Sequence, residues 1–230
     1  MRGVFVTATD TGVGKTVLAG AICAVLRARG ERVAAYKPVV TGTAEPEPGV
    51  PPDHVLLATC TGQRPAQVTP RTFGPAVSPH LAATAAPLDP AALEAAAHAA
   101  APVDGVLVVE GVGGLLVPLD DQGYDVRALA RVLGLPVVVA ARPGLGTINH
   151  TLLTIEAARS AGLDVRGVVL TPWPDAPSAT ERSNKATIAS LGDVTVSRLP
   201  RATALTPAAL ATAGTQLPLD RWIGSAAPPG

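Results

Sequence analysis

Aromatic residues are scarce in this sequence, and charged residues are few. Phe, Trp and Tyr together make up 3% of the 230 residues and charged residues 16%, whereas hydrophobic residues reach 47%. A disordered chain has the opposite balance, so the composition predicts a globular core built mainly from Val, Leu, Ile and Ala. The formal net charge is zero, which argues against a general role in binding nucleic acid or a membrane surface.

The sequence also lacks the patterns of a zinc-binding or exported protein. Its two cysteines, Cys23 and Cys60, form no CxxC pair and match no zinc spacing, so we interpret them as free buried thiols. The four histidines show no HExxH-like spacing. The start of the chain has no signal-peptide pattern, and no apolar run reaches the roughly 20 residues that span a bilayer. The sequence therefore predicts a cytoplasmic protein.

Short apolar runs alternate with segments of helical periodicity along the chain. Strands are expected at residues 3–7, 32–37, 105–109, 136–140, 165–170 and 194–199. Helices are expected at residues 14–29, 53 to about 62, 125–133, 147–161 and 178–191, with two short helices within 78–100. This alternation predicts one α/β domain over residues 1–224, with a parallel sheet covered by helices on both faces, and a frayed tail at 225–230.

The segment Ala8–Thr16, which reads ATDTGVGKT, follows the first expected strand and opens the first expected helix. Glycines in this setting allow a tight turn that directs backbone N–H groups at phosphate oxygens, and the helix N-terminus adds partial positive charge. Thr9 stands where the strict motif has glycine. We predict a phosphate-loop NTPase-like fold in which Lys15 reaches the β- and γ-phosphates and Thr16 ligates Mg²⁺. The nucleotide contacts expected from this loop are Gly12, Val13, Gly14, Lys15, Thr16 and Val17.

Polar residues also stand at the ends of two other expected strands. Glu110 follows the strand at 105–109, where a carboxylate beside a phosphate loop typically serves as a ligand of a metal or water. Lys37 ends the second strand and is expected to face the ligand crevice. A solvated loop carboxylate and a surface lysine are the respective alternatives. Asp53 precedes a helical stretch, where aspartate is more often an N-cap, so the residues alone leave its metal role open.

Several segments together resemble the dethiobiotin synthetase family. Thr9–Thr16 matches the family's phosphate loop, with Ala8 replacing its leading glycine. The family's Tyr-Lys-Pro-Val, Ser-Pro-His, Val-Glu-Gly-x-Gly-Gly and Gly-x-Ile-Asn-His segments stand at Tyr36–Val39, Ser78–His80, Val109–Gly114 and Gly146–His150. The matches keep their order and span residues 3 to about 170, whereas the last quarter of the chain matches poorly. Such an ordered set is much more specific than the phosphate loop alone.

The resemblance implies a ligase of biotin biosynthesis. The family forms the cyclic urea of dethiobiotin from 7,8-diaminopelargonate, CO₂ and ATP, through a carbamate and a carbamic-phosphoric anhydride. By this likeness Lys15 and Lys37 would be catalytic, holding the γ-phosphate and the carbamate, and Thr41 would bind the diamine end of the substrate. Mg²⁺ would be held by Thr16, Asp53 and Glu110.

Further contacts are implied by the same resemblance. The nucleotide would also meet Glu110, Gly111, Val112, Gly113, Thr171, Pro172, Pro200 and Arg201. The distal carboxylate of the substrate would meet Gly146, Thr147 and Asn149 of a second subunit, which implies a homodimer with the substrate site at its interface. Plain helix capping is the alternative for Thr147 and Asn149.

One residue departs from the family in a way that bears on the nucleotide base. Thr171 follows the late strand where the family usually has an asparagine that reads the adenine amino group. A hydroxyl lacks the paired donor and acceptor of an amide. We therefore expect a relaxed nucleotide preference, with phosphate contacts supplying most of the affinity.

Three alternatives to a ligase are open to a sequence of this type. A partitioning-type switch ATPase carries a signature lysine five residues before the loop lysine, where this chain has Asp10. The synthetase part of a cobalamin-pathway amidotransferase needs a glutaminase domain with a nucleophilic cysteine, for which the chain is too short. A phosphate-loop fold kept for a structural role would not require the full set of lysines and carboxylates.

Overall fold

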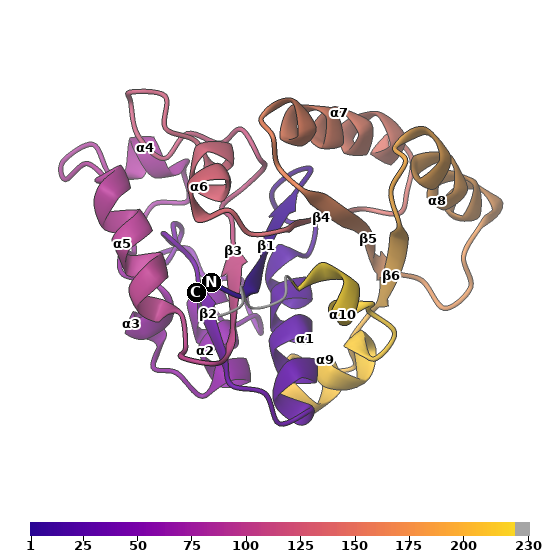
Figure 1. Cartoon of the computed structure of the whole chain (residues 1–230), viewed down its shortest axis with the longest axis horizontal. Helices are drawn as coiled ribbons and strands as arrows, with labels where there is room; N and C mark the ends of the chain where they lie inside the picture. Colours follow the sequence, from indigo (N-terminus) through magenta and orange to yellow (C-terminus); the bar gives the residue numbers. More distant parts are fainter. Residues whose placement is uncertain (224–230) are drawn as a thin grey trace, which may run out of the picture.

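Six parallel strands form the central sheet, in the order β2-β3-β1-β4-β5-β6 (Figure 1). The computed structural model describes residues 1–223. The strands are β1 (Gly3–Ala8), β2 (Val33–Tyr36), β3 (Val106–Glu110), β4 (Val137–Ala141), β5 (Val165–Trp173) and β6 (Val196–Pro200). Each neighbouring pair is parallel, so the predicted α/β fold with a parallel sheet is confirmed. The carboxyl ends of the strands therefore share one edge of the sheet, where such folds bind ligands.

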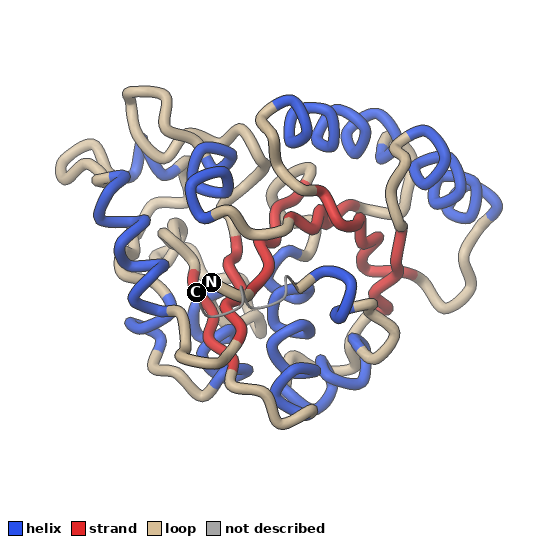
Figure 2. Tube along the Cα trace, in the orientation of Figure 1, coloured by secondary structure: helices blue, strands red, loops and turns tan. Residues whose placement is uncertain are grey.

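Helices cover both faces of this sheet (Figure 2). Among the described residues they are α1 (Lys15–Ala28), α2 (Asp53–Thr61), α3 (Pro65–Val68), α4 (Pro79–Ala82), α5 (Pro90–Ala100), α6 (Val126–Leu133), α7 (Thr147–Ser160), α8 (Ala179–Leu191), α9 (Pro207–Gly214) and α10 (Leu219–Trp222). Helices α1, α2, α9 and α10 pack on one face, and α5, α6, α7 and α8 pack on the other. All residues of β1, β3 and β4 are consequently buried.

The side chains of β1 alternate between two hydrophobic clusters. Val4 and Val6 join the cluster beneath α1, whereas Phe5 joins the cluster around α6, because successive strand residues point to opposite faces. The end of β3 interrupts this apolar pattern. Glu110 pairs in register with Val6 and is fully buried, so a carboxylate is held inside the protein at the ligand-binding edge of the sheet.

The structure extends the prediction in two ways. It adds the short helices α3, α9 and α10, and it extends β5 from Leu170 to Trp173. Helices α3 and α9 each begin with proline in the first turn, where proline is favourable although proline-rich sequence is otherwise typical of loops. Helix α9 packs closely on α1, since a Cβ on Gly214 would lie 3.0 Å from Val25 Cγ2. Such a contact between distant segments leaves no pattern in the local sequence.

The chain near its end is anchored on the sheet by Trp222. This residue is fully buried, and its indole nitrogen lies 2.7 Å from the place that a Cβ on Gly167 would occupy, so β5 needs a glycine there. The domain boundary predicted at residue 224 and the tail predicted at 225–230 lie outside the described residues. Between residues 1 and 223, no helix is both long enough and apolar enough to cross a membrane.

Candidate active site

The loop between β1 and α1 has the backbone geometry of an anion-binding turn. Gly12 and Gly14 adopt φ values of +70° and +99°, a left-handed conformation that other residues rarely adopt. Within the described part of the chain, the amides of residues 12–17 form no backbone hydrogen bond. The loop therefore presents a set of free N–H donors next to the start of α1, as phosphate binding requires.

Replacing Gly14 with alanine is expected to weaken nucleotide binding at least about tenfold, because the left-handed backbone and a steric contact both oppose the new methyl group. A Cβ at Gly14 would lie 3.1 Å from Thr171 Cγ2. Gly30 provides the matched control, since it has φ +82° with nothing within 4 Å of its Cβ position. Gly30→Ala is expected to lower the free energy of unfolding by about 1 kcal/mol and to leave affinity unchanged. Calorimetric titration with Mg-ADP measures the affinities, and equal binding by the two variants would contradict the prediction.

Lys15 lies folded back over this loop. Its ammonium donates a hydrogen bond to the carbonyl of Asp10 at 3.0 Å, and the residue is buried at 6% exposure. Burial lowers the pKa of Lys15 to about 8, although the negative charge of Glu110 partly opposes that effect. A bound triphosphate would supply the negative charge that this desolvated ammonium needs.

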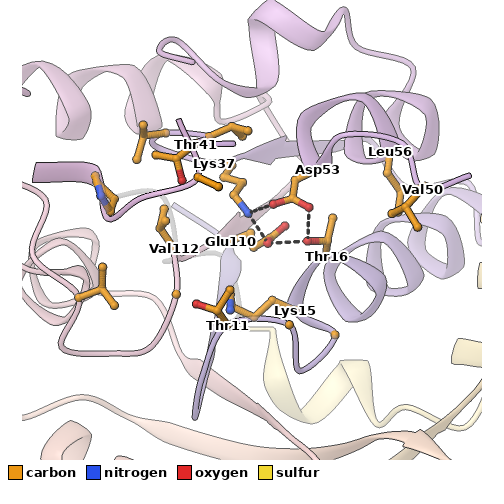
Figure 3. Close-up of a pocket in the computed structure, with 18 of the residues that line it drawn as sticks. Thr11, Lys15, Thr16, Lys37, Thr41, Val50, Asp53, Leu56, Glu110 and Val112 are labelled. Carbon is orange, nitrogen blue, oxygen red and sulfur yellow. Dashed lines mark hydrogen bonds and ion pairs between the residues drawn. The ribbon is translucent and has the colours of Figure 1, made fainter. Parts of the chain in front are cut away.

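Four side chains from different parts of the chain meet beside the loop in one polar cluster (Figure 3). The cluster comprises Thr16, Lys37, Asp53 and Glu110. The Lys37 ammonium lies 2.6 Å from Glu110 Oε1 and also forms an ion pair with Asp53. Thr16 Oγ1 lies 2.9 Å from Asp53 Oδ1 and 2.8 Å from Glu110 Oε1. Because β2, β3 and β1 are neighbours, the residues at their carboxyl ends converge as the sequence predicted.

Burial and mutual attraction set the charges of this polar cluster. Burial alone would lower the pKa of Lys37, but the negative charges of Glu110 and Asp53 raise it above its usual range. Complete burial raises the pKa of Glu110, and Lys37 offsets part of that effect. Burial would also raise the pKa of Asp53, yet the attraction and hydrogen bond of Lys37 hold it below its usual value. The cluster therefore depends on having a cation among its carboxylates.

The structure does not support the capping alternative for Asp53. Asp53 is the first residue of α2, the N-cap position belongs to Pro52, and no side-chain capping hydrogen bond is formed there. Its carboxylate instead points to Lys37 and Thr16. Glu110 likewise is no solvated loop residue, and Lys37 is no surface lysine, since each is at most 3% exposed.

The same cluster fits Mg²⁺. Its ligands would be the hydroxyl of Thr16 and the carboxylates of Asp53 and Glu110, an all-oxygen set of the kind that Mg²⁺ prefers. Glu110 Oε2 is buried and has no hydrogen-bond partner among the described residues. In this part of the chain, no three His, Cys, Asp or Glu side chains are grouped to hold a metal by themselves. The ion would therefore need Thr16 and phosphate oxygens, as Mg²⁺ bound with a nucleotide does.

A cavity of about 610 Å³ opens above the polar cluster, a volume suited to a small substrate and part of a nucleotide. The predicted site residues that line it are Gly12, Gly14, Lys15, Thr16, Val17, Lys37, Thr41, Asp53, Glu110, Val112 and Gly113. Those that do not line it are Val13, Gly111, Gly146, Thr147, Asn149, Thr171, Pro172, Pro200 and Arg201. Among the latter, Thr171 lies directly against Gly14 of the phosphate loop, and a Cβ on Gly111 would meet Val126 at 2.9 Å.

The segment Gly146–Asn149 lies at the start of α7. Gly146 is the N-cap with φ +87°, and no side chain makes a capping hydrogen bond, so the capping alternative for Thr147 and Asn149 is not supported. Thr147 is buried, and its hydroxyl lies 3.3 Å from that of Thr151. Leu145, just before the helix, is 95% exposed.

The chain has clear relatives of known function. A family model described as an AAA domain matches residues 2–209. The ATP-dependent dethiobiotin synthetase BioD of Anaeromyxobacter dehalogenans is 45% identical over 174 residues, covering 74% of this chain and 76% of that protein. The chain belongs to the dethiobiotin synthetase family. Dethiobiotin synthetases of the same name from Mycobacterium avium and Bacillus subtilis are 38% and 34% identical, over 84% and 85% of this chain and 85% of each relative.

Solved structures of other proteins share the fold of this dethiobiotin synthetase family member. A ParA family ATPase from Chlorobium tepidum TLS superposes with a TM-score of 0.54 at 11% identity, covering 94% of this chain and all of that one. Apo McdA from Cyanthece gives a TM-score of 0.52 at 12% identity, with 93% and 90% coverage. At such identities the likeness shows the fold alone. Asp10 stands where a partitioning-type ATPase needs its signature lysine, so that alternative is not favoured.

Sequence reasoning missed the apolar wall of the cavity. Val39, Val40 and Val50 line it together with Pro51 and Val117. Val39 and Val40 come just after Lys37 and Pro38, so their place after a strand end was a usable signal. Val50 and Pro51 belong to the irregular segment at 41–52, whose sequence gives no indication that it turns back over the site.

Proposed function

We propose that this chain is an ATP-dependent dethiobiotin synthetase that closes the cyclic urea of dethiobiotin in biotin biosynthesis. Its substrates are 7,8-diaminopelargonate, CO₂ and a nucleoside triphosphate. The observation that carries the proposal is the placement of Lys37 between the buried carboxylate of Glu110 and the partly exposed carboxylate of Asp53, beside a phosphate loop and inside a single cavity. A nucleotide switch has no need for a cavity of about 610 Å³ next to its phosphates.

The chemistry divides into three bond-forming steps. An amine of the substrate adds to CO₂ and loses a proton, which gives a carbamate. A carbamate oxygen then attacks the γ-phosphorus and displaces the nucleoside diphosphate, forming a carbamic-phosphoric anhydride. The second amine attacks the carbonyl carbon, closes the ring and expels phosphate. Each intermediate carries negative charge, so the site has to supply cations and exclude water.

The residues of the site match these demands. Lys15 neutralises the γ-phosphate, and Lys37 holds the carbamate next to it, so the attacking oxygen and the phosphorus are brought together. Mg²⁺, held by Thr16, Asp53 and Glu110, would draw charge from the transferred phosphoryl group. Thr41 lines the cavity and binds the diamine end. The valine-rich wall accommodates the aliphatic chain of the substrate.

The distal carboxylate of the substrate is assigned to the start of α7 in a second subunit. Gly146, Thr147 and Asn149 do not line the cavity of their own chain. The helix N-terminus attracts anions, and Leu145 beside it is almost fully exposed, as a residue at a subunit interface would be in one chain alone. A homodimer is therefore part of the proposal. Sedimentation equilibrium is expected to give a dimer at assay concentrations, and an active monomer would exclude this assignment.

The proposed reaction is tested by phosphate release from purified protein with Mg²⁺, ATP and bicarbonate, with and without 7,8-diaminopelargonate. Release is expected to depend on the diamine, and mass spectrometry is expected to detect the cyclic urea. Phosphate release that does not depend on the diamine would favour a switch ATPase, and no release with any triphosphate would favour a structural role.

A cytoplasmic location is also proposed, because both cysteines are free and buried, as in a reducing compartment.

Nucleotide selectivity is expected to be weak, below about tenfold or about 1.4 kcal/mol between bases. Thr171 offers a single hydroxyl, is 2% exposed and lies against Gly14 of the phosphate loop. The phosphate contacts would then supply most of the affinity, and they are the same for every triphosphate. Competition among ATP, CTP and GTP at equal concentrations measures the preference. A strong preference for ATP would show that other groups read the base.

A further inference from the structure

The phosphate loop is held from outside the cavity by an arginine that belongs to none of the family's matched segments. Arg142 directly follows the last residue of β4, at the ligand-binding edge of the sheet. Its Nη2 donates a hydrogen bond to the carbonyl of Thr11 at 3.2 Å. A Cβ on Gly12 would lie 3.8 Å from the same nitrogen, and apart from the adjacent residues 11 and 13 no other heavy atom of the described residues lies within 4 Å of it. Arg142 is thus the side chain that covers this side of the loop.

The bonded carbonyl belongs to the same peptide unit as the amide of Gly12. In a trans peptide the C=O and N–H groups point in opposite directions. A guanidinium that fixes the Thr11 carbonyl on the outside therefore directs the Gly12 amide to the inside. Gly12 lines the cavity, and its amide makes no backbone hydrogen bond among residues 1–223. The contact thus orients a free donor toward the phosphate site.

The positive charge of Arg142 also favours phosphate binding at the loop. Arg142 forms no ion pair with any carboxylate of the described residues. Its positive charge therefore adds to the potential at the loop, where a triphosphate brings several negative charges. A charged donor also polarises the peptide whose carbonyl it binds, which strengthens the amide at the other end.

We propose that Arg142 is a positioning residue for the nucleotide, which fixes the Thr11–Gly12 peptide so that the Gly12 amide faces the phosphates. It acts through the loop and does not touch the reacting atoms. The proposal rests only on the nucleotide-binding part of the proposed function. Binding of a nucleotide without the diamine therefore tests it, whatever reaction the protein catalyses.

Arg142→Ala is expected to raise the dissociation constant of Mg-ADP about five- to tenfold, the loss of one charge-assisted hydrogen bond at an exposed site. Arg142→Lys keeps the positive charge but lacks the planar guanidinium with its several N–H donors, and it is expected to bind Mg-ADP with intermediate affinity. Arg131→Ala is the charge-matched control, since Arg131 on α6 is exposed and forms no hydrogen bond or ion pair among the described residues. Isothermal titration calorimetry on the full chain gives the three constants.

Tripolyphosphate, used as a competitor of Mg-ADP, has no base or ribose, so its binding reports on the phosphate contacts of the loop alone. Its inhibition constant is expected to rise in Arg142→Ala by the same factor as that of ADP. At saturating nucleotide, kcat and the diamine KM are expected to stay within about twofold of wild type. Unchanged ADP binding, an equal loss in Arg131→Ala, or a loss for ADP but not for tripolyphosphate would each overturn the proposal. If Arg142→Ala does not fold, Arg142→Lys and Arg142→Gln give the same comparison.

Discussion

Lys37→Ala is expected to lower the rate of dethiobiotin formation by about 10³-fold while nucleotide binding is retained. The ammonium is the group that would hold the carbamate beside the γ-phosphate, and it is positioned by Glu110 at 2.6 Å and by Asp53. Lys15, which binds the loop backbone at Asp10, is untouched by the change. Steady-state assays with the diamine, together with calorimetric titration of Mg-ADP, separate catalysis from binding. Near-normal turnover would remove Lys37 from the mechanism.

The same substitution also has a cost in stability that follows from burial. Glu110 is fully buried, and without Lys37 its charge is in direct contact with no cation of residues 1–223. Leaving one partner of a buried ion pair unpaired typically costs about 3 kcal/mol in the free energy of unfolding. Lys37→Met, which keeps the volume of the side chain better than alanine does, is expected to show this loss too. Urea unfolding without Mg²⁺ measures it.

A double variant shows whether the stability lost in Lys37→Met comes from the unpaired charge or from packing. In the Lys37→Met background, Glu110→Gln removes the unpaired charge, so most of the lost stability is expected to return. Mg²⁺ is also expected to stabilise Lys37→Met more than the wild-type chain, because the ion would supply the missing positive charge. If the double variant is as unstable as Lys37→Met, the loss comes from packing and not from the buried carboxylate.

The polar cluster was largely predictable because most of its members stand at strand ends or in the phosphate-loop motif, and these positions determine where a side chain lies in the fold. Lys37 directly follows β2 and Glu110 ends the neighbouring parallel strand β3, and the parallel arrangement alone places such positions at one edge of the sheet. The position of Thr16 follows from the phosphate-loop motif. Asp53 is different, since an aspartate before a helix is ordinarily a cap, and only its contact with Lys37 and Thr16 shows another use. The family resemblance supplied what the local pattern could not.

Other features depend on contacts between segments that are far apart in the sequence. Trp222 packs on Gly167 of β5, and Arg142 holds the carbonyl of Thr11, which is 131 positions away. Nothing in the residues around Arg142 distinguishes it from a surface arginine. Both contacts arise from the order in which the strands are arranged, with β4 beside β1 and β5 beside β4. Periodicity identifies strands but does not give that order.

Glu110→Gln is expected to raise the Mg²⁺ concentration for half-maximal activity at least about tenfold and to lower kcat about 10²-fold. Glutamine keeps the shape of the side chain and removes the charge that an ion would need. Asp53→Asn is expected to have a smaller effect, because the Asp53 side chain is 41% exposed and water can replace its oxygen, whereas Glu110 is fully buried. The ranking of the two variants therefore follows from their access to solvent.

The control for this comparison is a carboxylate outside the cavity. Glu94 accepts a hydrogen bond from the Tyr124 hydroxyl at 2.8 Å, so Glu94→Gln changes a partly buried acid without touching the polar cluster. Its Mg²⁺ dependence is expected to match wild type. Binding of Mn²⁺, followed by electron paramagnetic resonance in the presence of ADP, reports on the site without turnover. If Glu110→Gln binds Mn²⁺ as tightly as Glu94→Gln does, the buried carboxylate serves to hold Lys37 and the metal ligands lie elsewhere.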